Sequence, residues 1–207
     1  MTDLVDDLDT VVESACTALE TVLDRDWSVP ATGLTWTCRG TVEHTADDLF
    51  SYATQIAGRR PTLGGYVPFD CHSTAPAEPE CAVHAEAAEG NAGLVRVLDA
   101  SGGLLVAVAR QADPTKRGGH PYGDSDPHGF AAMGTIETLL HVHDVAGPLG
   151  LTWEPAPDVV RRLLDRLFPE APDGTDPWAT LLQVTGRDPS TPLERWRWDG
   201  RPAAERA

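Results

Sequence analysis

Hydrophobic positions recur at helical spacing in six segments of the chain. In the first segment, residues 3–24, apolar residues such as Leu4, Leu8 and Val11 follow at intervals of three and four, and Asp and Glu fill the opposite face. The same periodicity predicts further helices over residues 38–58, 84–111, 128–147, 157–168 and 177–185. We therefore expect an all-α fold.

Several residues predict where these helices begin and end. Thr37 is a suitable N-cap for the second helix, and Gly147-Pro148 is expected to stop the fourth. Ser101-Gly102-Gly103 could kink the third helix or split it in two, and residues 102–109 have a composition that would also suit a short strand.

The connections between the helices are long. Residues 59–81 and 112–127 are dense in Gly and Pro and read as loops, and loops of that length in a compact domain are usually functional. Long connections favour a helical bundle with crossover links over one of tight hairpins. We expect residues 1–150 to form this bundle and residues 151–207, with the Trp196-Arg197-Trp198 step, to pack on it within one structural domain.

The charge and the termini exclude several functions. Sixteen basic against 32 acidic residues give a net charge of −16, which repels nucleic-acid phosphates and anionic lipid headgroups. No run approaches 18 consecutive apolar residues, and the N-terminus is acidic where a signal peptide would be basic. We therefore expect a cytoplasmic protein without nucleic-acid or membrane partners.

The four cysteines are widely spaced and contain no C-x-x-C pair. In a cytoplasmic chain they are expected to be free thiols. Cys16 falls on an apolar helical stripe. Cys38 lies near a helix start, where the dipole could lower a thiol pKa, but a packing role is the commoner one.

The fourth predicted helix carries the strongest candidate for chemistry. Glu137 and His141 are four residues apart, so they share one helical face and could bind one divalent cation together. Asp144 lies on the same face and could orient an imidazole. A solvated ion pair is the alternative reading of such spacing. An imidazole from another helix, such as that of His44, would complete a His₂Glu set, the ligand count of catalytic zinc sites.

The position of His44 on its own helix argues against this role. It lies about 160° from the centre of the apolar stripe, at the usual ~100° per residue, beside Asp47 and Asp48. On that evidence alone His44 is a surface residue. It can face the core only if the second helix is covered on more than one side.

Three stretches together resemble the DinB-like four-helix proteins, and within them the actinobacterial mycothiol-dependent maleylpyruvate isomerase-like branch. The second predicted helix is similar to the family's Trp-led helix with its metal histidine, and the fourth to its E-x-x-x-H helix. The closing segment resembles a "GR … W-x-W" ending of the family. The stretches are LTWTCRGTVEHTADDLFSYA (34–53), GTIETLLHVHDVAGPLG (134–150) and LLQVTGRDPSTPLERWRW (181–198).

The resemblance implies that His44, Glu137 and His141 are metal ligands, with Asp144 supporting them. The metal in the family is most often zinc, although Ni²⁺ or Fe²⁺ would also suit a His₂Glu set. The family resemblance further implies mycothiol as cofactor, a small electrophilic substrate and a homodimer. Only about 57 residues follow Gly150, too few for the isomerase's second domain, so maleylpyruvate itself is not the expected substrate.

Three functions remain open at this level. The first is a metal-dependent isomerase or S-transferase that uses a low-molecular-weight thiol. The second is a metal-binding or stress-associated protein without catalysis. The third is a hydrolase in which a metal-activated water takes the place of the thiol.

Overall fold

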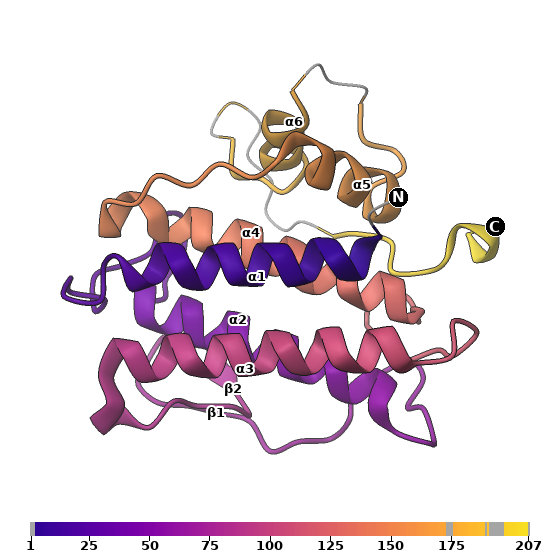
Figure 1. Cartoon of the computed structure of the whole chain (residues 1–207), viewed down its shortest axis with the longest axis horizontal. Coiled ribbons are helices and arrows are strands. Elements are labelled where there is room, and N and C mark those ends of the chain that lie inside the picture. The colour runs from indigo at the N-terminus through magenta and orange to yellow at the C-terminus, as the bar shows by residue number, and fades with distance from the viewer. Residues whose placement is uncertain (1–2, 173–175, 189, 191–196, 207) are drawn as a thin grey trace.

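Four long helices pack around a common core in the computed structural model, which describes residues 3–172, 176–188, 190 and 197–206 (Figure 1). The fold is all-α apart from one small two-stranded sheet in the described part of the chain. The four helices are α1 (Leu4–Glu20), α2 (Cys38–Ala57), α3 (Gly90–Gln111) and α4 (Pro127–Leu149).

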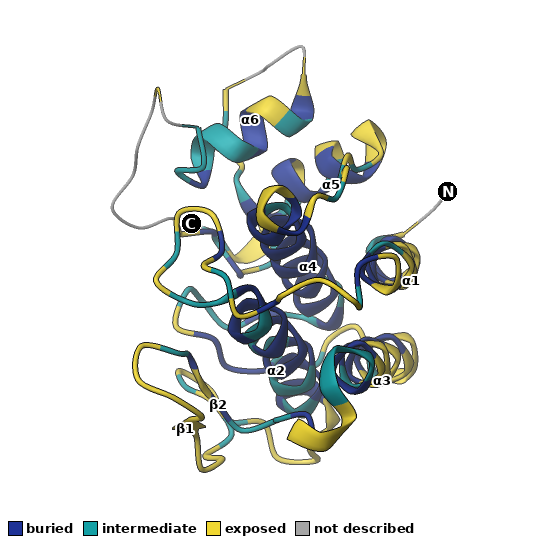
Figure 2. Ribbon diagram, turned by 90° about the vertical axis from the view of Figure 1, so that its left-hand side faces the viewer, coloured by how far each residue is buried: buried dark blue, intermediate teal, exposed yellow. Residues whose placement is uncertain are grey.

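Helices that follow one another in sequence are not always neighbours in space. α1 packs chiefly against α3 and α4, and so does α2. The connection from α1 to α2 therefore crosses the molecule. Seen end-on, α1 and α3 expose their outer faces, whereas α2 and α4 are buried along most of their length (Figure 2). Every residue of α4 from Gly129 to Val142 is buried.

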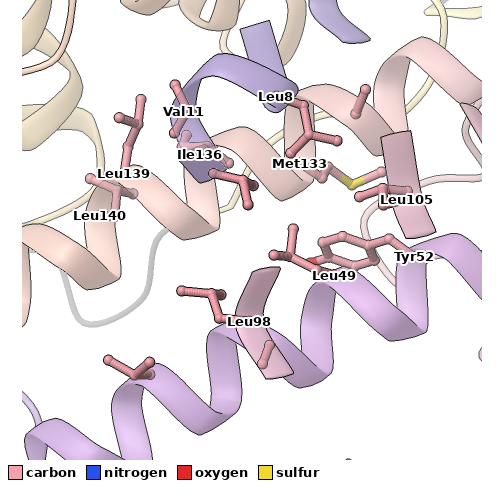
Figure 3. Packing of buried hydrophobic residues seen from close by; sticks show 14 of the residues in the cluster. Leu8, Val11, Leu49, Tyr52, Leu98, Leu105, Met133, Ile136, Leu139 and Leu140 are labelled. Atoms are coloured by element: carbon pink, nitrogen blue, oxygen red, sulfur yellow. The ribbon is translucent and has the colours of Figure 1, made fainter. Parts of the chain in front are cut away.

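The core is formed by large aliphatic side chains from all four long helices (Figure 3). Removing this apolar surface from water stabilises the fold by roughly 25 cal/mol per Å². Members of the cluster shown in the figure include Leu8, Leu49, Tyr52, Leu98, Leu105, Met133 and Ile136.

One expectation about where the helices end is wrong. α4 does not stop at Gly147-Pro148 but runs to Leu149 and ends at Gly150, which adopts φ 74°. Pro148 is tolerated because the Asp144 carbonyl, which would accept its missing N–H, accepts the backbone N–H of Thr32 at 2.8 Å instead. The helix predicted over residues 84–111 is confirmed as α3, which is one continuous helix, so it is not split at Ser101-Gly102-Gly103 and residues 102–109 do not form a strand.

Gly102 has a packing role in α3. A Cβ at this position would lie 2.5 Å from Val12 Cγ1, so glycine lets α3 approach α1 closely. The N-cap prediction for α2 is confirmed, since the Thr37 side chain accepts the Gly40 N–H at 3.0 Å.

The loop predicted at 59–81 contains the small sheet, β1 (His72–Ser73) paired antiparallel with β2 (Glu80–Cys81). A short 3₁₀ helix, η1 (Ala87–Glu89), leads into α3. Two buried carboxylates of α2 hold the segment that connects β2 to η1. Asp47 accepts the N–H groups of Ala82 and Val83 at 2.9 Å, and Glu43 accepts that of Ala85 at 3.1 Å.

The rest of the chain covers one side of the bundle. α5 (Pro157–Leu167) packs on α4, and α6 (Pro177–Val184) packs on α5; a 3₁₀ helix, η2 (Ala203–Glu205), lies near the end. Trp198 is buried and joins the core, as expected, while Trp196 lies outside the described residues.

By length and composition alone, one helix in the described residues would pass for a membrane span. It comprises residues Ala87–Gln111, and half of its apolar stretch is buried inside the structure. A buried core helix passes the same test, so this is weak evidence for a membrane.

All four cysteines are free thiols, and burial raises the pKa of Cys38 to about 11, which favours a packing role.

Candidate metal centre

His44 faces the interior of the molecule even though it lies opposite the apolar stripe of α2. The residues around it, Thr41 to Glu43 and Thr45 to Asp47, are all buried, because α2 is covered on several sides. Its side chain is 23% exposed and packs against Trp36, with ring centroids 4.7 Å apart. The surface position derived from the helical wheel is therefore wrong.

Glu137 and His141 lie on the buried face of α4 that meets α2. Both are at least 95% buried, and the Glu137 Oε2 atom lies 3.1 Å from His141 Nε2. The His44 and His141 rings have centroids 5.2 Å apart. One donor atom from each of His44, Glu137 and His141 lies within 4.8 Å of the other two, so this group could hold a metal ion.

The separation within the α4 pair fits a shared ion. Two donors that each lie about 2.0–2.1 Å from one zinc ion, at octahedral to tetrahedral angles, are about 2.9–3.4 Å apart. The Glu137–His141 distance of 3.1 Å falls in that range. Glu137 Oε2 is also buried, and among the described residues it has no hydrogen-bond partner besides His141, with which it forms an ion pair. A carboxylate oxygen buried beside two imidazoles is well placed to bind a cation that takes the place of the proton between it and His141.

The tautomer of His141 follows from its other neighbour. His141 Nδ1 lies 3.0 Å from Asp144 Oδ2, and Asp144 is paired side-on with Arg187 at 2.9 and 2.8 Å. A carboxylate held in this way is ionised and can only accept, so Nδ1–H of His141 donates to it. His141 Nε2 is therefore the nitrogen that faces Glu137. Asp144 takes the supporting role that the sequence predicts for it.

Burial and neighbouring charges shift the pKa values of His44 and His141 in opposite directions. Burial lowers the pKa of His44 to about 4, aided by the nearby His141, so His44 is neutral at pH 7. Burial also acts to lower the pKa of His141. Its hydrogen bond to Asp144 and the Glu137 carboxylate outweigh that effect and raise this pKa to about 9. The same pair of imidazoles keeps the pKa of Glu137 below its ordinary value despite burial.

Sequence reasoning missed Asp48 as a site residue. Its Oδ2 atom lies 3.3 Å from His44 Nε2, and burial, with Glu137 nearby, raises the pKa of Asp48 well above its usual range. The signal was available, because His44 and Asp48 are four residues apart, the same spacing as Glu137 and His141.

Aromatic side chains connect the two long loops to the Glu137 carboxylate of α4. The Tyr52 hydroxyl approaches Glu137 Oε1 at 3.5 Å, and the Tyr52 ring packs against His120 at 5.8 Å between centroids. His120, from the loop at 112–127, is buried and lies 3.3 Å from the hydroxyl of Tyr66, from the loop at 59–81. His120 is therefore a buried residue between the two loops and α2.

The structure thus brings together His44, Glu137, His141 and Asp144, the four residues that the sequence singles out. His72, His84 and His128 are not part of this group, and His84 pairs with Glu43 at 3.2 Å. Comparison with models of protein families, with curated proteins and with solved structures finds no match to this chain.

Proposed function

We propose that this protein is a metal-dependent enzyme of thiol-transferase or isomerase type, built on a DinB-like four-helix bundle. His44, Glu137 and His141 bind one divalent ion, preferably Zn²⁺, and the reactants are a low-molecular-weight thiol of mycothiol type and a small electrophile. The convergence of two imidazoles and one carboxylate from the two central helices carries this proposal. The sequence resemblance to the mycothiol-dependent branch supports the thiol.

The number and kind of donors support a catalytic site. Structural zinc sites use four protein ligands, whereas three protein ligands leave room for an exogenous one. When bound, zinc lowers the pKa of a coordinated thiol or water and so supplies a nucleophile near neutral pH.

The chain's own residues prepare the site. Asp144 holds His141 so that Nε2 faces Glu137. The Tyr52 hydroxyl can donate to Glu137 Oε1, which orients the other oxygen, Oε2, toward the imidazoles. Trp36, half-buried, packs over both His44 and His141, with ring centroids 4.7 and 6.2 Å away, and so limits the access of water from that side.

Asp48 favours a second candidate function, a metal-binding protein without catalysis. Its carboxylate lies 3.3 Å from His44 Nε2, close enough for a modest rotation to bring it to the same ion as a fourth protein ligand. Four protein ligands would leave no place for a thiol.

Cobalt substitution distinguishes the two candidates. Co²⁺-loaded protein is titrated with mycothiol and its absorption spectrum is recorded. The enzyme proposal predicts a new sulfur-to-cobalt charge-transfer band that saturates, in the wild type and in Asp48→Asn alike. A spectrum that mycothiol leaves unchanged in the wild type but alters in Asp48→Asn would instead show that Asp48 fills the fourth position.

A further inference from the structure

Arg187 follows α6 and reaches back to α4, where it meets Asp144 side-on. Arg187 Nε lies 2.9 Å from Asp144 Oδ1, and Nη2 lies 2.8 Å from Oδ2. The side chains are 11% and 3% exposed, so the pair is largely shielded from water. Two parallel hydrogen bonds between planar groups fix the carboxylate in rotation as well as in position.

The fixed carboxylate in turn determines how His141 is presented. Asp144 Oδ2 accepts from Arg187 Nη2 and from His141 Nδ1 at 3.0 Å. The chain of contacts therefore runs from Arg187 through Asp144 to the imidazole and ends at Nε2, 3.1 Å from Glu137. Groups that orient a metal-bound histidine in this way typically change metal affinity about 10–100-fold when they are removed.

We propose that Arg187 is a positioning residue of the metal centre, and that through it the segment 177–188 belongs to the metal-binding unit. This inference rests on the proposed binding of metal by His44, Glu137 and His141. It extends the metal-binding unit beyond residues 1–150, the bundle that the sequence predicts.

The coupling has a reciprocal consequence. If the segment 177–188 strengthens metal binding through Arg187, then bound metal must stabilise the position of that segment by the same free energy. The backbone amides of α6 and of the turn after it should therefore exchange more slowly with solvent when metal is present.

The chain offers a matched control for Arg187. Arg162 of α5 also meets a buried aspartate side-on, Asp7 of α1, with Nε–Oδ2 at 2.7 Å and Nη2–Oδ1 at 2.6 Å. Asp7 is 2% exposed. Among the described residues, the hydrogen bonds between Arg162 and Asp7 do not involve His44, Glu137 or His141, so the loss of this pair tests the effect of breaking a side-on ion pair elsewhere.

The experiment measures Zn²⁺ affinity by chelator competition, and amide exchange of residues 177–188 with and without Zn²⁺. We expect Arg187→Met to bind Zn²⁺ about 10–100-fold more weakly than the wild type, and Arg187→Lys to fall between them. Arg162→Met should bind like the wild type. Zn²⁺ should slow exchange in residues 177–188 of the wild type but not of Arg187→Met.

A double variant keeps the test valid if Arg187→Met leaves the buried Asp144 charge unpaired and does not fold. Arg187→Met/Asp144→Asn carries no such charge, and it should bind Zn²⁺ as Asp144→Asn does, because Arg187 acts through Asp144. A further loss in the double variant, or an Arg187→Met protein that binds like the wild type, overturns this inference alone. A wild type that binds no Zn²⁺ overturns the metal centre itself.

Discussion

At the scale of single residues, the two imidazoles of the centre differ in their proton affinity. His44, with a pKa of about 4, is ready to bind a cation at pH 7, whereas His141, with a pKa of about 9, still carries a proton on Nε2. A cation at the site must displace that proton, since metal and proton compete for the same lone pair.

We therefore predict that metal binding near pH 7 releases about one proton. Apparent Zn²⁺ affinity should rise about tenfold per pH unit through neutral pH and level off near pH 9, the pKa of His141. Calorimetric titrations in buffers of different ionisation enthalpy measure both quantities. In Asp144→Asn the rise should end at a lower pH, because the hydrogen bond to Asp144 helps to raise the pKa of His141. An affinity that is constant across this range would contradict the assignment of His141.

The site also shows what a single residue's sequence context can and cannot predict. The spacing of Glu137, His141 and Asp144 was enough to group them, because all three lie on one helix. His44 could not be placed in this way. The apolar stripe of α2 marks only its most hydrophobic face, and polar residues such as Thr41, Thr45 and Asp47 are buried on the others.

At the scale of helices, periodicity predicted the six α-helices of the described residues, and their ends differ from the predicted ones by up to six residues, most at the start of α3. The exceptions have tertiary causes. α4 continues through Pro148 because the Asp144 carbonyl, which the missing N–H of Pro148 leaves free, accepts the N–H of Thr32 from a loop instead. Gly102 lies in the interior of α3, although glycine disfavours helices, because the approach of α1 leaves no room for a Cβ there. Neither partner is visible in the local sequence.

The two adjacent glycines of α3 should respond oppositely to alanine. At Gly102 a Cβ would meet the stiff Val12 side chain at 2.5 and 2.9 Å, so Gly102→Ala should destabilise the protein by about 1–3 kcal/mol. At Gly103 nothing lies within 4 Å, and Gly103→Ala should stabilise it by about 0.5–1 kcal/mol through helix propensity.

Denaturant unfolding of the two variants provides this comparison, with the wild type as reference. Equal effects at both positions, or a stabilising Gly102→Ala, would show that α1 and α3 do not approach each other as closely as described.

At the scale of the whole molecule, buried neutral histidines make stability sensitive to acid. Burial lowers the pKa of both His44 and His120 to about 4, below the 6.5 of an exposed histidine. Between these values each of the two histidines binds a proton in the unfolded chain but not in the folded one, so the pair lowers the free energy of unfolding as the pH falls from about 6.5 to about 4. Asp48, whose pKa is raised in the folded protein, acts in the opposite direction as a single group.

We predict that the melting temperature of the metal-free protein decreases over this interval. His120→Asn should show a smaller decrease, because it removes one of the two buried imidazoles while its amide oxygen can still accept the Tyr122 N–H. Thermal unfolding at a series of pH values measures the effect. The prediction is wrong if the variant and the wild type lose the same amount of stability.

The packing of the helices in the whole molecule could not be predicted from the sequence. The all-α class was predictable from hydrophobic periodicity, but the burial of α2 and α4 on several sides depends on how four helices pack. That packing brings His44 to Glu137 and His141, and it brings Arg187 to Asp144 across 43 residues of sequence.

The most direct test of the account is the metal content of the protein purified without a metal-affinity tag. Elemental analysis should find close to one divalent ion, chiefly zinc, per chain in the wild type and little in His44→Ala and His141→Ala. The Arg162→Met variant, which loses an ion pair elsewhere, should retain the metal. A wild type that carries no more metal than the two histidine variants would contradict the central claim.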